Sequence, residues 1–411
     1  MKRKNAGLII FILGTLTALG PFSIDMYLPG FPAIAADLHT TVAQVSLSLS
    51  SFFIGISAGQ LLYGPLLDKY GRKKPLYFGL ALYVLASLAC ALATSIDALI
   101  YLRFVQAIGS CAATVAAMAM VRDLFPVEDS ARVFSLLMLV VGVSPMVAPT
   151  LGGYVTAHLG WEAVFFILTG ISALILAAVY FRLPESFKPD PAYSLKPRPI
   201  LSNFLAVLRD SQFLTYALTG AIAFAGLFAY VSGSPIVFME IFGVSETVYG
   251  WIFALLSVGF IGASQLNNFI LKRLKSEQIV ITAMRVQAII GVIFFVGTYN
   301  GWYDLTGTVI LLFLFLACLG FSFPNASALS LAPFTKNAGS ASALMGALQM
   351  AIGSLSSIAI TVFNDQTALP MVGLMAGAAL LALCVLGLGR KKIKKQVSKV
   401  ADQILITETV I

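Results

Sequence analysis

Apolar stretches of about twenty residues, separated by short charged or turn-rich segments, recur along the whole chain. A helix of this length crosses a hydrocarbon core of roughly 30 Å. The pattern therefore predicts a membrane-spanning helix in each of twelve stretches. They lie near residues 7–29, 43–66, 76–95, 98–121, 133–156, 161–181, 213–236, 248–269, 278–298, 306–330, 339–363 and 368–388.

The first stretch needs a decision of its own, because it has a basic start and an apolar core, MKRKNAGLIIFILGTLTALG. Small residues at Ala33–Asp37 offer a site like that of a cleaved signal peptide. The apolar core is longer than a typical signal core, however, and further spans follow at once. We therefore interpret the stretch as the first membrane span.

Positive charges alternate with the predicted spans. Every Lys and Arg except Arg103 and Arg285 lies at a terminus or in every second loop. The intervening loops have no Lys or Arg, only acids such as Asp37 and Asp97. Because Lys and Arg concentrate on the cytoplasmic side of membrane proteins, both termini are predicted to be cytoplasmic. The net charge of +8 is explained by this topology, and nucleic-acid binding need not be invoked.

The longest loop is rich in proline and charge and divides the chain into two halves of six spans. The similar segments SAGQLL near Gln60 and GASQLN near Gln265 suggest a parallel internal repeat. The predicted organisation is an N-terminal bundle (1–181), a cytoplasmic linker loop (182–212), a C-terminal bundle (213–389) and a basic cytoplasmic tail (390–411). The fold class is an all-α polytopic membrane protein with two pseudo-symmetric six-helix bundles.

Composition narrows the function classes. Hydrophobic residues make up 59% of the chain and charged residues only 11%, which is too little charge for a soluble domain. The four cysteines fall inside predicted spans without metal-ligand spacing, and the two histidines lie in short loops. Neither a P-loop pattern nor paired carboxylates occur within the spans. A membrane-embedded enzyme and an ATP-driven pump are therefore disfavoured, and no metal site is expected.

The loop between the second and third spans reads GPLLDKYGRKKPL. Asp68 can pair with the basic residues, and Gly71 allows a tight reversal of the chain. An ordinary positively charged loop would not need this ordered pattern. The loop resembles the signature loop of the major facilitator superfamily. In that reading Gly64, Asp68, Gly71 and Arg72 are candidate gating residues.

Further motifs strengthen the resemblance. LIYLRFVQAIGSCAA (99–113) is similar to the superfamily's fourth-span motif, and GVSPMVAPTLGGYV (142–155) resembles its fifth-span antiporter motif, with Ala148 where Gly is usual. DMYLP, YVSGSP and AGSASALMGALQ resemble segments of the bicyclomycin-resistance (Bcr/CflA) group of drug:proton antiporters. The fifth-span motif adds Pro145, Pro149, Gly152 and Gly153 as candidate gating residues, because prolines bend the helix and glycines permit close packing.

The resemblance implies two bundles around a central cavity and proton-coupled export of small amphipathic compounds, including phenicol-like antibiotics, by alternating access. It implies no catalytic residue and no cofactor, because the proton gradient drives transport. The expected partners are a drug substrate, protons and the lipid bilayer, for a monomer in the bacterial cytoplasmic (inner) membrane. A proton-coupled transporter of a specific metabolite, exporting or importing, remains the alternative.

Asp25 is the candidate proton-coupling carboxyl, since it is the acidic residue placed well inside a span. A carboxylate at hydrocarbon depth costs several kcal/mol unless it is paired, hydrated or protonated. Burial favours the neutral form and a nearby guanidinium favours the charged form, so changes in hydration could switch its protonation. The alternative is a solvated cap at the outer end of the helix. Glu240 and Asp37 are weaker candidates because they lie nearer the loops.

Arg103 lies at a depth similar to that of Asp25, so ionic or hydrogen-bonded communication between them is possible. It resembles the buried motif arginine of such antiporters, which implies a role in proton coupling; a structural arginine bonded to carbonyl groups is the alternative. Arg285 is interpreted as reaching back to the cytoplasmic face. Polar or aromatic residues within apolar spans are the candidate substrate-binding positions: Tyr27, Gln106, Ser144, Tyr230, Asn325 and Gln349.

Overall fold

The computed structural model describes residues 3–189, 197–334, 338–363 and 365–409. Its described part contains helices and connecting turns but no strand. The N-terminal half comprises α1 (Arg3–Asp25), η1 (Leu28–Gly30), α2 (Phe31–Asp37), α3 (Val42–Tyr70), α4 (Lys73–Ala91), α5 (Ile96–Leu124), α6 (Val127–Leu159) and α7 (Glu162–Arg182). The C-terminal half comprises α9 (Ser211–Pro235), η2 (Ile236–Ile241), α10 (Glu246–Ile270), α11 (Ser276–Tyr299), α12 (Leu305–Leu331), α13 (Ala338–Val362) and α14 (Leu369–Thr409).

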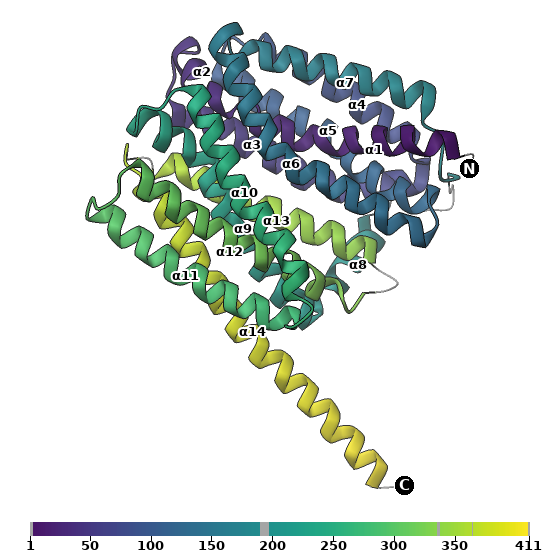
Figure 1. Ribbon diagram of the computed structural model, residues 1–411. Helices are drawn as coiled ribbons and strands as arrows, with labels where there is room; N and C mark the ends of the chain where they lie inside the picture. Colours follow the sequence, from purple (N-terminus) through teal and green to yellow (C-terminus); the bar gives the residue numbers. More distant parts are fainter. Residues whose placement is uncertain (1–2, 190–196, 335–337, 364, 410–411) are drawn as a thin grey trace.

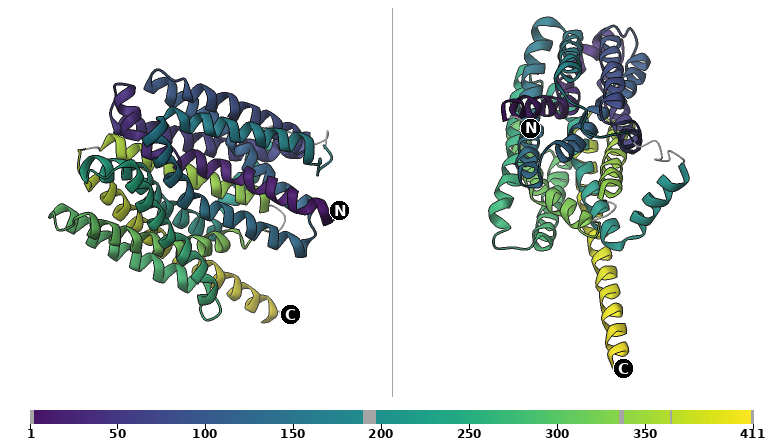
Figure 2. Two further views of the ribbon diagram at one scale, coloured as in Figure 1. Left: turned by 45° about the horizontal axis from the view of Figure 1, so that its top comes forward. Right: turned by 90° about the vertical axis from the view of Figure 1, so that its right-hand side faces the viewer.

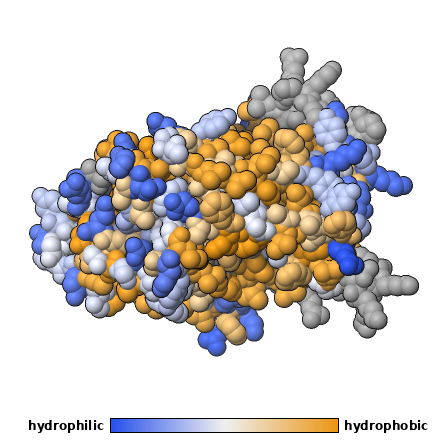
Figure 3. All heavy atoms as spheres, turned by 90° about the horizontal axis from the view of Figure 1, so that it is seen from above, coloured by the Kyte–Doolittle hydropathy of each residue, from blue (hydrophilic) through white to orange (hydrophobic). Residues whose placement is uncertain are grey.

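Twelve helical segments in the described residues are long and apolar enough to cross a membrane, which confirms the predicted number of spans. Their lipid-facing sides carry exposed apolar side chains such as Phe11, Phe78 and Leu174, which would be unfavourable in water. On the face shown in Figure 3, an apolar band separates two more polar ends, as expected for a protein that crosses a bilayer.

Side-chain caps fix where several helices begin. The side-chain oxygens of Thr41, Ser95, Asp210, Ser245 and Asp304 each accept a hydrogen bond from the backbone amide three residues later. Such a bond satisfies one of the amides that a helix leaves unpaired at its N-terminus. The spans therefore start at polar residues, next to the loops.

Two segments are more helical than the sequence suggested. Within the predicted linker loop, Pro197–Arg209 forms helix α8. Its two prolines, Pro197 and Pro199, occupy the first turn, where a missing amide hydrogen costs nothing. The predicted basic tail belongs to α14, which runs as one helix from the last span to Thr409 and projects from the bundle in Figure 1.

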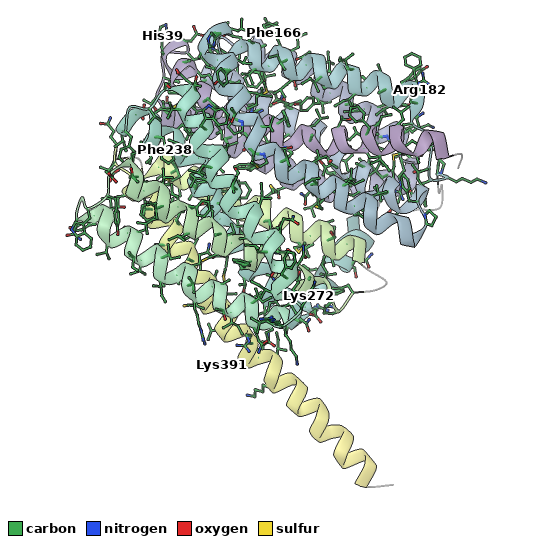
Figure 4. The ribbon with its side chains drawn as sticks, in the orientation of Figure 1. His39, Phe166, Arg182, Phe238, Lys272 and Lys391 are labelled. Carbon is green, nitrogen blue, oxygen red and sulfur yellow. The ribbon has the colours of Figure 1, made fainter. Side chains whose placement is uncertain are left out.

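The two halves form separate bundles that lie against each other (Figures 1 and 2). Across the junction, α3 packs on α13 and α6 packs on α10. Figure 4 shows His39 and Arg182 at opposite ends of the N-terminal bundle. His39 marks the end at which α2 lies, and by the predicted topology this is the outer end. The junction between the halves at this end positions the candidate site.

Candidate functional site

Asp25 is the last residue of α1, and the sequence explains why the helix ends there. Pro29, four residues later, has no amide hydrogen to donate to the Asp25 carbonyl, so the α-helical hydrogen-bond pattern cannot continue. The chain turns into the short helix η1. Asp25 is only 5% exposed, and among the described residues its carboxyl has no hydrogen-bond or ion-pair partner. It is a buried acid, and the solvated-cap alternative does not describe it.

Tyr230 on α9 and Tyr249 on α10 belong to the same buried cluster as Met26 and Tyr27, which follow Asp25 in the sequence. The Tyr249 hydroxyl is already bonded to the Ser234 hydroxyl at 2.8 Å. Within the described part of the chain, the Tyr230 hydroxyl is buried without a hydrogen-bond partner, while its ring stacks on Phe253 with the centroids 5.3 Å apart. The end of α1 and the buried phenols of the C-terminal half are therefore packed into one cluster at the junction.

Arg103 on α5 is completely buried inside the N-terminal half. Its Nη2 donates to the Ser23 carbonyl oxygen at 2.7 Å, and its Nη1 donates to the Gln106 side chain. The guanidinium carbon lies 4.2 Å from the ring centroids of both Tyr27 and Phe52. A delocalised cation between two aromatic faces is stabilised by cation–π attraction, most strongly where water is absent.

Arg103 and Asp25 are therefore linked through the α1 backbone. Among the described residues, Arg103 bonds to the carbonyl of Ser23, two residues before Asp25, and has no ion pair with the carboxyl. Its Nε remains without a partner. The direct contact that the sequence left possible is not formed among the described residues, and a change at Arg103 would reach Asp25 through the last turn of α1.

Two predicted substrate-binding residues belong to the surroundings of Arg103. Tyr27 lies on the guanidinium and its hydroxyl is 3.0 Å from the Ser48 hydroxyl. Gln106 accepts from Arg103 and donates to the Ser87 hydroxyl at 2.7 Å. Both side chains are almost fully buried. The structure therefore places them in a polar core within one half.

The other predicted substrate-binding residues are dispersed. Ser144 is buried and donates to the Val140 carbonyl of its own helix at 2.7 Å. Asn325 on α12 donates to the Asn267 side chain of α10 at 2.8 Å. Gln349 lies on α13 and is 7% exposed. Of the six candidates, Tyr27 and Tyr230 lie in the buried cluster that includes Met26, the residue after Asp25.

The glycine pair of α6 permits close backbone packing, for Gly152 within the N-terminal half and for Gly153 across the junction. A Cβ atom on Gly152 would overlap the backbone oxygen of Met26, and one on Gly153 would overlap that of Glu246 on α10. In the opposite direction, a Cβ on Gly250 would lie 2.9 Å from the Pro149 oxygen. The α6–α10 junction thus has backbone against backbone.

Hydroxyl groups join α3 to the C-terminal half. The Ser357 hydroxyl on α13 lies 2.6 Å from that of Ser50 on α3 and accepts from that of Ser232 on α9 at 2.6 Å. Thr361 donates to the Ala43 carbonyl at 2.9 Å, and Ser57 donates to the Ala347 carbonyl at 2.9 Å. Together with the α6–α10 contact, these bonds hold the halves together along the outer part of the junction.

At the opposite end, the predicted signature loop is held by ion pairs. Arg72 contacts Asp68 and Asp123, both at 2.8 Å. Glu185, beyond α7, accepts from the amides of Arg72 and Lys73. Burial of the guanidinium opposes its charge, but the bonds and charges of the two aspartates outweigh burial and raise the pKa of Arg72 above its usual value.

Gly71 and Gly64 behave differently within this loop. Gly71 adopts φ +81°, a conformation that glycine reaches without strain, and so makes the reversal between α3 and α4. A Cβ on Gly64 would meet nothing within 4 Å. Its predicted gating role gains no steric support in this conformation.

Known proteins share this architecture. The family model of the Major Facilitator Superfamily matches residues 13–360. The chain belongs to this superfamily.

Named relatives agree with the assignment. The chain is 34% identical to the "Uncharacterized MFS-type transporter YdgK" of Bacillus subtilis, over 94% of this chain and 96% of that protein. It is 32% identical to the "Bicyclomycin resistance protein homolog" of Haemophilus influenzae, over 93% and 96%. It is 31% identical to the "Multidrug resistance protein MdtL" of Escherichia coli O139:H28, over 83% and 85%.

The solved structure of a D-xylose–proton symporter aligns with a TM-score of 0.74 at 14% identity, covering 93% of this chain and 97% of that one. At this identity the likeness concerns the fold alone. Together the findings confirm a multi-pass membrane transporter of the major facilitator superfamily that resembles the bicyclomycin-resistance group. It is a transport protein rather than an enzyme.

The contacts of the buried Arg103 lead to a first prediction. Arg103→Lys keeps the charge but loses the planar group between Tyr27 and Phe52 and the fork of donors. We expect a destabilisation of about 2 kcal/mol and a loss of transport, measured by thermal unfolding and by drug uptake into liposomes. Arg285→Lys, at an exposed position on α11, is the matched control and should change neither. Equal behaviour of the two variants would contradict a special role for Arg103.

Several functional residues escaped the sequence analysis. Asp123 and Glu185 hold the signature loop, Tyr249 belongs to the buried cluster beside the end of α1, and Ser357 joins the halves. Glu185 carried a faint signal, because it lies in a loop with an excess of positive charge, whereas Asp123 shares its predicted loop with two further acids, Glu128 and Asp129. No spacing marks Tyr249 or Ser357, since their partners are known only once the halves are packed.

Proposed function

We propose that this transporter is a proton-coupled multidrug efflux antiporter that exports small amphipathic compounds by alternating access. The observation that carries the proposal is Asp25, a buried carboxyl without a described bonding partner, at the end of α1 next to η1, which packs on α10 of the other half. A residue of this kind within a membrane is costly and is a candidate for a proton relay. The printed names of the bicyclomycin- and multidrug-resistance relatives support the drug class.

The aromatic side chains near the junction suit such substrates. Phe53 of α3 contacts Phe228 of α9 across the halves, with ring centroids 4.2 Å apart. Phe224 continues this cluster toward Phe260 and Phe323. Apolar and aromatic walls with few polar anchors accommodate varied amphipathic ligands. We assign these rings and the free Tyr230 hydroxyl to the substrate path.

The proposed cycle uses the contacts of both ends. With the cavity open toward the cytoplasm, substrate binds as Asp25 releases its proton to that side. The halves then rock about the junction, which separates the Ser50–Ser357 and α6–α10 contacts and opens the outer side. Reprotonation of Asp25 from outside expels the substrate. The inward proton gradient supplies the free energy, so we expect neither a cofactor nor a metal.

The topology, the location and the oligomeric state of the protein are part of the same proposal. The alternation of positive charge supports cytoplasmic termini and a bacterial inner-membrane location. Both halves and the junction between them are formed by a single chain, which supports a monomer as the transporting unit. The Arg72 ion pairs with Asp68 and Asp123 would be the cytoplasmic contacts that rearrange during closure.

The sign of drug-evoked proton movement tests the proposal. Purified protein is placed in liposomes with a lumenal pH dye and no initial pH difference, and a neutral phenicol is added outside. An antiporter exchanges entering drug for protons, so the lumen becomes alkaline whichever way the protein is inserted. Acidification would reveal a symporter instead, and drug entry without a pH change would contradict proton coupling. Protein-free liposomes give the passive background.

A further inference from the structure

The turn between α10 and α11 forms a basic hollow on the surface of the C-terminal half. It contributes Lys272, Arg273 and Lys275 to an open hollow of about 580 Å³. The remaining lining comes from Leu271, Leu274, Ser276, Glu277 and Leu329. The superfamily's transport cycle, as proposed above, makes no use of this hollow.

The exit of α14 adds further positive charge beside the hollow. Arg390 Nε lies 2.7 Å from the Glu277 carboxylate, which joins α14 to the start of α11. Lys391 and Lys392 follow directly in the sequence. Figure 4 shows Lys272 and Lys391 toward the same end of the C-terminal half. The one acidic group in the lining is thus already paired, and it leaves the lysines and Arg273 uncompensated.

The matching loop of the N-terminal half is arranged differently. There, Arg72 is neutralised by Asp68 and Asp123. Among the described residues, Lys272, Arg273 and Lys275 form no ion pair. The three cations of the C-terminal turn are therefore free to bind an anion from outside the protein.

The edge of the hollow is apolar. Phe269 is 66% exposed, Leu274 45% and Leu271 39%, and the Lys272 ammonium lies 5.4 Å from the Phe269 ring centroid. The membrane helix α10 ends at Ile270 and α11 begins at Ser276. The hollow consequently lies at the boundary between the hydrocarbon core and the headgroups. Its cations are on the water side, and the exposed Phe269 ring and the two leucines are on the lipid side.

We propose that this hollow, formed by Lys272, Arg273 and Lys275 beside Arg390, binds the phosphate headgroup of an anionic phospholipid from the leaflet on the side of the termini. Basic pockets between membrane helices bind anionic headgroups in this way. The lysine stems lie along apolar surface while their ammonium groups reach the phosphate. The apolar rim would hold the proximal part of the acyl chains, which a free phosphate ion lacks.

Lipid titration followed by native mass spectrometry tests the site. The detergent-purified full chain is titrated with phosphatidylglycerol and, separately, with phosphatidylcholine. Wild type should retain phosphatidylglycerol in preference to phosphatidylcholine. The triple variant Lys272→Gln, Arg273→Gln, Lys275→Gln should lose affinity by roughly tenfold or more, whereas Lys272→Arg, Arg273→Lys, Lys275→Arg should retain it.

A charge-matched control comes from the other half: Lys69→Gln, Lys73→Gln, Lys74→Gln removes three charges from the corresponding loop. It should bind phosphatidylglycerol within about twofold of wild type. An equal loss in this control would show attraction by net charge alone and overturn the site. Undiminished binding by the first triple variant would also overturn it. Displacement of the lipid by millimolar inorganic phosphate would identify a free-anion site and contradict the lipid assignment.

Discussion

Gly153→Ala is expected to reduce drug transport by about tenfold or more. The added methyl group would overlap the Glu246 backbone oxygen at the start of α10, and backbone cannot move aside as a flexible side chain would. Overpacking of this kind typically costs about 1–3 kcal/mol, which corresponds to a roughly 5- to 150-fold shift between two conformations. The cost falls on the conformation in which α6 and α10 are in contact, so the outer side would close poorly.

Gly142→Ala on the same helix provides the matched control. There the nearest atom to a new Cβ is a methyl carbon of Ile261 at 3.7 Å, an ordinary van der Waals contact. Drug uptake into liposomes gives the rate, and retained drug binding together with size-exclusion chromatography shows that each variant is folded. Transport by Gly153→Ala at the rate of Gly142→Ala would contradict the importance of the α6–α10 contact.

The helical framework was predictable because membrane insertion imposes a simple rule on sequence. An apolar stretch of sufficient length must be a helix that satisfies its own backbone, and positive charges mark every second loop. The end of the first long helix was less accessible. The segment LPGFP predicted a break in the helix, but only the structure shows that α1 ends at Asp25, four residues before Pro29.

The functional pairings were less predictable, for a physical reason. Asp25 stood out because an acid is costly in an apolar span. Serine carries no such signal, because most hydroxyls in membrane helices can bond to a carbonyl of their own helix. Ser330 does this with Ser327, whereas Ser50 also meets Ser357, which lies 307 residues away in the sequence. Contacts between the halves depend on how the bundles pack, and local pattern does not encode that.

Tyr27 and Gln106 illustrate the same limit. A polar tip in an apolar span indicates a polar environment but does not say which one. For these two residues that environment is the completely buried Arg103. Tyr230 had the same sequence signal, yet among the described residues its hydroxyl has no partner, and its ring stacks on Phe253 in the cluster at the junction.

Asp25→Asn is expected to abolish drug-evoked proton movement. The amide is nearly isosteric with the carboxyl, so α1 and its contacts with the C-terminal half should persist. An amide cannot bind and release a proton near neutral pH, however. The variant should still bind drug and should fail to exchange it for protons. Asp37→Asn is the matched control, because Asp37 lies nearby on α2 at an exposed position and only accepts from the Trp161 indole at 3.3 Å.

The most direct test of the account is therefore the lumenal pH of liposomes after a neutral phenicol is added outside, measured in parallel for wild type, Asp25→Asn and Asp37→Asn. We expect the lumen to become alkaline with wild type and with Asp37→Asn, and we expect no change of lumenal pH with Asp25→Asn. Full alkalinisation with Asp25→Asn would contradict the account, because the proton would then travel by way of another group.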